Sequence, residues 1–369
     1  MVSWFGHLGP LSALWLLIVA AAVPMWLLER KRFGGSELPM RSRCSGVAWW
    51  TGALAVVGLF LLSFMLQVRL GGPRAFSFPE ILSSLLAILG VIFFLSLRDY
   101  LDGLVEPVSQ FGKVLLRDWD AEAGRASVVL GWVVKAFFLP LMLGWCYTWL
   151  ESALAADMKS ASSAVFVLIF ALLYAVDCAF AIIGYVYSST RIGAEIRSVD
   201  RTWLGWLSVL VCYPPLAVFV IDGWLLYRSA EDWRHWLGGS SLLGPIWAAG
   251  ILALTAIYTS ATMAFGPRFS NLTHRGVITS GPYRFVRHPA YISKNLSWWM
   301  ISMPFFSVHG YGTAIFNSLA LLCVNGIYAL RAYTEERHLR SDPEYLRYVH
   351  WIEHHGLVAR IFGMFRRVV

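Results

Sequence analysis

The sequence predicts an all-α fold, a polytopic bundle of transmembrane helices. Hydrophobic residues make up 58% of the 369 residues and charged residues only 14%, whereas a soluble domain has about 25% charged residues. Nine apolar runs approach or exceed the roughly 20 residues that a helix needs to cross a bilayer. They cover residues 8–28, 46–67, 79–97, 128–151, 163–188, 202–221, 243–265, 290–306 and 311–330. The composition therefore excludes a soluble globular protein.

The distribution of basic residues predicts the orientation of the bundle. With the N-terminus outside, the loops after the odd-numbered runs and the C-terminal tail carry 23 Lys and Arg residues, against 5 on the opposite side. Cytoplasmic segments of membrane proteins are enriched in Lys and Arg. We therefore expect nine spans, an outside N-terminus and a cytoplasmic C-terminus. The first run has its positive charge after the apolar stretch, the reverse of a signal peptide, so we expect it to be retained.

Charge and cysteine usage limit the partners that are expected. The net charge of +8 is typical of this topology and of contact with anionic lipid headgroups, so no nucleic-acid partner is expected. The five cysteines are scattered without a CxxC pair. His350 and His354 share a helix face beside Glu353, but their order is not that of a zinc-binding HExxH motif. We predict no metal site.

Polar residues are concentrated in the last hundred positions, in two segments that flank the final pair of apolar runs. The segments cover 270–295 and 331–355, and the two runs between them are joined by a short stretch around 309–312. A tight helical hairpin returns the chain to the membrane face from which it started. Both polar segments are therefore expected at the same, cytoplasmic face, and we place the candidate site there.

Two local patterns in these segments suggest a binding site. Pro289 suits the first turn of a helix and keeps His288 out of helical geometry, so the imidazole is expected at a helix N-terminus. Arg331 and Glu335 are four residues apart and share a helix face. Two interpretations are open at this point: a surface ion pair with arginines that hold lipid phosphates, or the polar groups of a functional site.

Three strings in this region carry a resemblance that covers about the last 105 residues. The strings are Gly281-Pro282-Tyr283-x-x-x-Arg287-His288-Pro289-x-Tyr291, Arg331-x-x-x-Glu335-Glu336 and Tyr345-x-x-Tyr348. With these strings the chain resembles the isoprenylcysteine carboxyl methyltransferase family and the related phospholipid N-methyltransferases. One departure is Ser293-Lys294, where family members often have a glycine.

The resemblance implies S-adenosylmethionine as cofactor, held in a cytoplasm-facing pocket, and a substrate whose lipid tail enters from the bilayer. It places Arg331 at the polar end of the substrate, and we add Arg287 and Tyr345 as substrate-binding residues. The positions that it implies for cofactor binding are Val277, Ile278, Tyr283, His288, Pro289, Tyr291 and Glu335.

The first 240 residues match none of these strings. We therefore predict a division into an N-terminal transmembrane module of unknown role, residues 1–240, and a methyltransferase-like membrane domain, residues 241–369.

Elementary chemistry agrees with these roles. The methyl group of a sulfonium is already activated, so transfer requires chiefly in-line placement and exclusion of water. Glu335 can accept hydrogen bonds from an amine or ribose hydroxyls, and the rings of Tyr283 or Tyr291 can lie against adenine or the sulfonium. Arg331 can hold a carboxylate through two hydrogen bonds. We therefore assign Arg331 and Glu335 as the catalytic pair.

Three functions from different classes are compatible with these residues. The first is an S-adenosylmethionine-dependent methyltransferase acting on a lipophilic or lipidated acceptor at a carboxylate or other anionic group. The second is an NADPH-dependent membrane reductase of the sterol-reductase type, which has a distantly similar HPxY region and would use Arg284 and Arg287 on phosphates. The third is a non-catalytic lipid-binding or transport protein. We expect a bacterial inner-membrane location, with the endoplasmic reticulum as the alternative.

Overall fold

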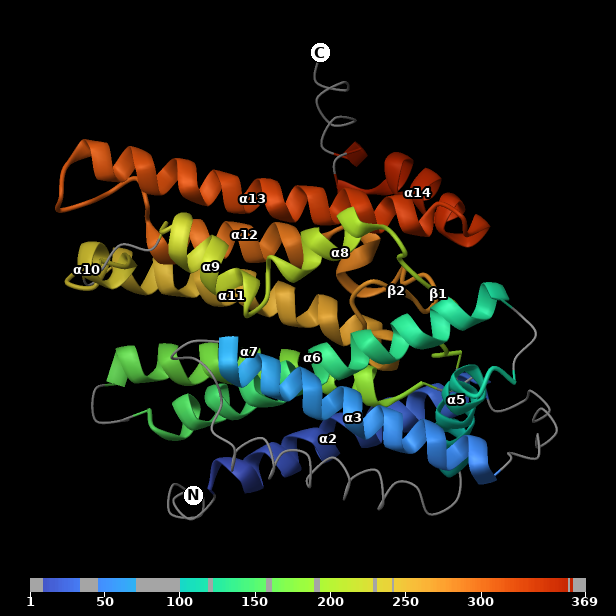
Figure 1. Cartoon of the computed structure of the whole chain (residues 1–369). Helices are drawn as coiled ribbons and strands as arrows, with labels where there is room; N and C mark the ends of the chain where they lie inside the picture. Colours follow the sequence, from blue (N-terminus) through green and yellow to red (C-terminus); the bar gives the residue numbers. More distant parts are fainter. Residues whose placement is uncertain are drawn as a thin grey trace. The chain divides into compact units, whose positions relative to one another are not determined.

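The computed structural model describes residues 9–33, 46–70, 100–118, 122–156, 161–188, 193–227, 231–240, 242–357 and 359–360. Helices account for nearly all of the regular structure in these ranges (Figure 1). The strands there are β1 (Ser198–Val199) and β2 (Thr273–His274), which pair antiparallel with Ser198 opposite His274. The prediction of a helical membrane protein is confirmed.

Five helices in the described part of the chain are long and apolar enough to cross a membrane. The helix α2 (Pro10–Phe33) carries a shorter apolar stretch, Pro10–Met25. The run predicted at 79–97 lies outside the described residues. The five long helices are α3 (Gly46–Leu70), α6 (Glu122–Leu154), α7 (Ala161–Val186), α11 (Leu243–Phe265) and α13 (Tyr311–Leu339).

Two predicted runs differ from single spanning helices. Residues 202–221 form α8 (Trp203–Leu210), a turn, α9 (Leu216–Phe219) and the start of the π-helical η3 (Val220–Trp224). Pro214 and Pro215 lie in the turn, and proline supplies no backbone N–H and restricts the residue before it. The prediction of one continuous helix there is wrong because hydropathy takes no account of these prolines.

The run at 290–306 forms α12 (Pro289–Ser302), which has 14 residues. At 1.5 Å per residue such a helix is about 21 Å long, shorter than the roughly 30 Å hydrocarbon core. It ends at Met303, whose φ of 40° lies in the left-handed region. This helix does not cross a bilayer by itself, and the count of nine spans stays a prediction.

The chain divides into two compact units. Unit 1 comprises Met1–Ala155, Ala175–Val199 and Phe265–Gly276, and unit 2 comprises Ala156–Tyr174, Asp200–Ala264 and Val277–Val369. The helix α7 contributes its first part to unit 2 and its last part to unit 1. Residues 200–240 belong to the same compact unit as most of the C-terminal segment. The predicted division at residue 240 separates two functional roles, and it stays a prediction.

Unit 1 is held together by close backbone contact and by one buried arginine. The helix α5 (Tyr100–Leu115) crosses α3 where both carry glycine, and a Cβ on Gly112 would lie 1.7 Å from the carbonyl oxygen of Ala48. Arg275, only 2% exposed, donates hydrogen bonds to the backbone carbonyls of Gly184 and Ala194. This arginine therefore organises the loop that contains β2 and the short 3-10 helix η4 (Gly266–Arg268).

Unit 2 is built around the hairpin of α12 and α13, with α8, α10 (Trp233–Leu237), α11 and α14 (Pro343–His355). Figure 1 shows α12 and α13 side by side. The Trp299 indole N–H donates to Asn325 Oδ1 at 2.7 Å, and Asn325 Nδ2 donates to Asn295 Oδ1 at 2.8 Å. These bonds satisfy polar groups inside an apolar hairpin and fix the alignment of its two helices.

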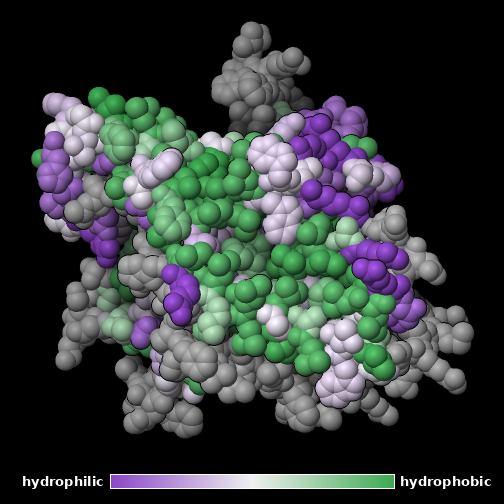
Figure 2. Space-filling model, viewed as in Figure 1, coloured by the Kyte–Doolittle hydropathy of each residue, from purple (hydrophilic) through white to green (hydrophobic). Residues whose placement is uncertain are grey.

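The surface of unit 2 changes along α13. Large apolar residues of its first half, including Ile315, Phe316 and Leu319, are exposed. Figure 2 shows an apolar surface over the middle of the helix and hydrophilic residues gathered near α14. An exposed apolar surface of this kind is consistent with α13 as one of the helices that are long and apolar enough to cross a membrane.

Candidate active site

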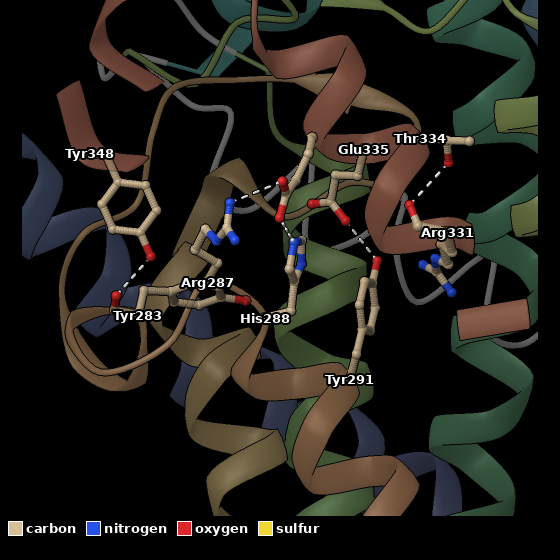
Figure 3. Close-up of polar contacts among 9 residues, drawn as sticks. Tyr283, Arg287, His288, Tyr291, Arg331, Thr334, Glu335 and Tyr348 are labelled. Carbon is tan, nitrogen blue, oxygen red and sulfur yellow. Dashed lines mark hydrogen bonds and ion pairs between the residues drawn. The ribbon is translucent and has the colours of Figure 1, made fainter. Parts of the chain in front are cut away.

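Two adjacent glutamates near the end of α13 contact the segment that leads into α12 (Figure 3). The Oε1 atom of Glu336 lies 2.8 Å from His288 Nε2, and its Oε2 accepts from Arg287 Nη1 at 3.1 Å. The Oε2 atom of Glu335 accepts the Tyr291 hydroxyl at 2.8 Å. The two polar segments predicted to meet at one end of the hairpin therefore do meet.

The local sequence explains how this segment presents its side chains. Pro289 is the first residue of α12, and His288 precedes it with non-helical backbone angles, φ −127° and ψ 61°, as expected before proline. The His288 ring stacks on the Tyr291 ring with the centroids 5.4 Å apart and the planes 5° apart. Upstream, Gly281 begins the short 3-10 helix η5 (Gly281–Arg284) with φ +60°, which glycine adopts without strain.

Arg331 is buried, with 7% of its surface exposed, and its guanidinium lies among aromatic rings. The guanidinium carbon is 5.2 Å from the ring centroid of Tyr291, 5.6 Å from that of Tyr213 and 5.8 Å from that of Tyr328. Figure 3 shows Arg331 and His288 on opposite sides of the Tyr291 ring. The interpretation of Arg331 as part of a surface ion pair is wrong.

The helix α14 packs against this region. Tyr345 and Tyr348 are buried, and the Tyr348 hydroxyl donates to the backbone carbonyl of Tyr283 at 2.7 Å. Burial raises the pKa of the Tyr348 hydroxyl to about 12. Burial, with the negative charges of Glu336 and Glu335, raises the pKa of Tyr345 further. Both hydroxyls are therefore neutral at physiological pH and act as hydrogen-bond donors rather than bases.

The structure brings most of the predicted site residues together. The one constellation contains Tyr283, Arg287, His288, Tyr291, Arg331, Glu335 and Tyr345. Val277 instead packs on the buried tyrosines of α14, and Ile278 follows it, partly buried. Pro289 is buried as the first residue of α12. The individual roles assigned to these residues stay predictions.

Sequence reasoning gave no role to Glu336, Tyr213 or Tyr328, which all contact the predicted residues. The sequence did point to Glu336, because it follows Glu335 directly in the string Arg331-x-x-x-Glu335-Glu336. Tyr213 carried no such signal because it lies in a distant segment that was read as a plain spanning helix. Among the described residues, no group of three or more His, Cys, Asp or Glu side chains is placed to hold a metal ion.

The fold and this constellation define a helical membrane protein with a polar, aromatic-lined site at one end of a helical hairpin. Residues 242–341 match the model of the isoprenylcysteine carboxyl methyltransferase (ICMT) family. The match runs from the start of α11 to the end of α13 and contains both acids and Arg331, so the resemblance is confirmed for this part of the chain. It indicates a membrane methyltransferase. No curated protein and no solved structure shows a significant match.

Replacing Glu336 by alanine is expected to loosen the segment before α12. The substitution removes the acceptor shared by Arg287 and His288, and charge-assisted hydrogen bonds of this kind contribute about 1.5–3 kcal/mol when buried, less when partly exposed as here. Hydrogen–deuterium exchange should show faster exchange of the backbone amides of residues 281–288. The control is Glu353→Ala, which removes an exposed acid on α14. Equal exchange in the two variants would contradict the role of Glu336 in holding Arg287 and His288.

Proposed function

We propose that the protein is an S-adenosylmethionine-dependent methyltransferase that methylates a carboxylate or other anionic group of a lipophilic acceptor. The observation that carries this proposal is the arrangement of α13, where buried Arg331 lies one turn from Glu335 and both contact Tyr291. A cation and a carboxylate held on one helix face supply separate recognition for an anionic acceptor and for a cofactor rich in donors.

Glu335 fits the cofactor because one oxygen of its carboxylate is hydrogen-bonded within the protein and the other is available to a ligand. Its Oε2 accepts from Tyr291, whereas its Oε1 accepts no hydrogen bond from any residue that the structure describes. The Tyr291 bond orients the carboxylate, so Oε1 is positioned to accept from an amine or a ribose hydroxyl. When bound, S-adenosylmethionine supplies a methyl group on a positively charged sulfur that becomes a neutral thioether.

Arg331 fits an acceptor that is already negatively charged. The guanidinium can hold a carboxylate with two parallel hydrogen bonds and so direct one oxygen toward the cofactor side. A carboxylate is deprotonated at neutral pH and needs no general base. The surrounding rings of Tyr213, Tyr291 and Tyr328 exclude water, which strengthens the electrostatic contact and protects the reacting groups.

The reductase alternative has less support from the same contacts. Phosphates of a nicotinamide cofactor need available cations, yet Arg287 is engaged by Glu336. Arg284 is exposed, with its guanidinium against the ring of Phe285. The family match over residues 242–341 also favours methyl transfer. A degenerate, non-catalytic site is disfavoured because His288, Tyr291 and Glu335 retain mutually consistent contacts.

We also propose that the N-terminus is outside and that residues 266–290 and the C-terminus are cytoplasmic, on the basis of the 23 to 5 bias of basic residues. In a variant without native cysteines, a cysteine at exposed Thr279 should react with an impermeant maleimide only after the cytoplasmic face is opened. One at exposed Val308, in the hairpin turn, should react from outside. The reverse pattern would exclude this topology. For the membrane itself we propose a bacterial inner membrane, with the endoplasmic reticulum as the alternative.

Calorimetric titration of the purified, detergent-solubilised protein tests the function directly. We expect saturable binding of S-adenosylhomocysteine and no binding of NADPH, because Glu335 offers an acceptor and Arg287 is already paired with Glu336. Binding of NADPH alone would replace the proposal with the reductase function. Binding of neither compound would favour the non-catalytic function.

The same titration separates the roles of Glu335 and Arg331. Glu335→Ala should weaken S-adenosylhomocysteine binding about 10- to 100-fold, the equivalent of a lost charge-assisted hydrogen bond of about 1.5–3 kcal/mol. Arg331→Ala should leave that affinity nearly unchanged and abolish formation of S-adenosylhomocysteine when lipids extracted from the native membrane serve as acceptors. Arg340→Ala, an exposed arginine at the end of α13, is the matched control. Unchanged cofactor affinity in Glu335→Ala, or unchanged turnover in Arg331→Ala, would refute the corresponding role.

A further inference from the structure

Lys294 is a cation in the second turn of α12 that lies among aromatic rings. Its Nζ atom is 5.0 Å from the ring centroid of Tyr258, 5.4 Å from that of Trp298 and 5.8 Å from that of Tyr328. Trp298 is one helical turn further from the start of α12 than Lys294 itself. The ammonium group therefore lies against rings of the hairpin and of α11.

These rings are the contacts of Lys294 among the residues that the structure describes, and no carboxylate there forms an ion pair with it. Lys294 is partly buried near the start of α12, where taking its charge out of water carries a free-energy cost. The cation–π contacts offset part of that cost and supply no negative charge. An ionisable side chain without a carboxylate partner in such a place is a candidate binding residue for an anionic group.

One buried ring links Lys294 to the candidate active site. Tyr328 is 4% exposed, and its ring centroid is 5.8 Å from Lys294 Nζ and 5.8 Å from the guanidinium carbon of Arg331. The same ring meets Tyr291 edge-on at 5.7 Å and Trp298 edge-on at 5.2 Å. The hairpin thus carries two cations at the two ends of one aromatic cluster, one beside the Tyr291–Glu335 pair and one beside Trp298.

We propose that Lys294 is a specificity-determining residue that binds a second acidic group on the methyl acceptor. The acceptor is then an amphiphile whose head group carries two acidic groups, either two carboxylates or a carboxylate and a phosphate. The group to be methylated lies at Arg331, and the other lies at Lys294. This inference rests on the proposed function. Lys294 belongs to the Ser293-Lys294 pair, which stands where family members often have a glycine.

Lipophilic acids that differ in the number of carboxylates test this inference. The probes are 2-dodecylsuccinate with two carboxylates, tetradecanoate with one and dodecanol with none, titrated into the protein saturated with S-adenosylhomocysteine. We expect the protein to bind 2-dodecylsuccinate at least about tenfold more tightly than tetradecanoate. Lys294→Met should remove that preference by weakening only 2-dodecylsuccinate about tenfold, and Lys294→Arg should retain it because the charge is kept.

Several results would overturn the inference. These are equal affinities of the unaltered protein for the two acids, an unchanged preference in Lys294→Met, or an equal loss for all three probes, which marks a purely structural lysine. Arg347→Met, an exposed basic residue on α14, should behave like the unaltered protein. The preference should also persist in nanodiscs containing phosphatidylglycerol, and its disappearance there would assign Lys294 to lipid phosphate instead of the acceptor.

The outcome is distinguishable from failure of the proposed function. Loss of both acids in Arg331→Met, with cofactor affinity intact and no effect of Lys294→Met, would leave the methyltransferase proposal standing and remove this inference. Absence of S-adenosylhomocysteine binding would remove the proposed function itself, whatever the three probes show.

Discussion

The candidate site depends on two neighbouring acids that bind different groups. Successive residues of a helix point about 100° apart, so Glu335 and Glu336 face different groups although they are adjacent. Glu336 holds Arg287 and His288 and thereby fixes the segment before α12. Among the described residues, Glu335 accepts one hydrogen bond, from Tyr291. A lone acid at either position could not both anchor the segment and keep an open oxygen.

This arrangement works only if α12 and α13 keep their alignment, and polar bonds inside the hairpin provide it. Apolar contacts between helices in lipid specify register weakly, because lipid tails are as apolar as leucine. The Trp299–Asn325–Asn295 chain has directional hydrogen bonds and tolerates little sliding. Displacing α12 by one turn would move Tyr291 by about 5.4 Å and separate its hydroxyl from Glu335. The structural polar residues of the hairpin therefore position the chemical ones.

The sequence was sufficient to predict that the two polar segments meet, because a short connection forces two consecutive helices back to the same membrane face. The sequence was not sufficient to predict which rings surround Arg331. The ring of Tyr213 lies in a segment that hydropathy reads as one spanning helix, and the structure breaks that segment at Pro214 and Pro215. Hydropathy windows measure apolar content, which prolines hardly change, whereas helix continuity depends on backbone donors that prolines lack. The contact between Tyr213 and Arg331 therefore involves a residue beside this break, which hydropathy does not predict.

The placement of cations against rings explains how a membrane-embedded site keeps positive charge available. An ion pair would lower the cost of burying the ammonium group of Lys294, but it would also neutralise the charge that an anionic ligand is to meet. Aromatic faces attract a cation through their quadrupole and carry no net charge. Rings of Tyr213, Tyr291 and Tyr328 therefore stabilise the guanidinium of Arg331 and add no net charge of their own. Under the proposed function, an acidic group of a lipophilic acceptor gains a partner of opposite charge at this site and leaves a medium that solvates it poorly.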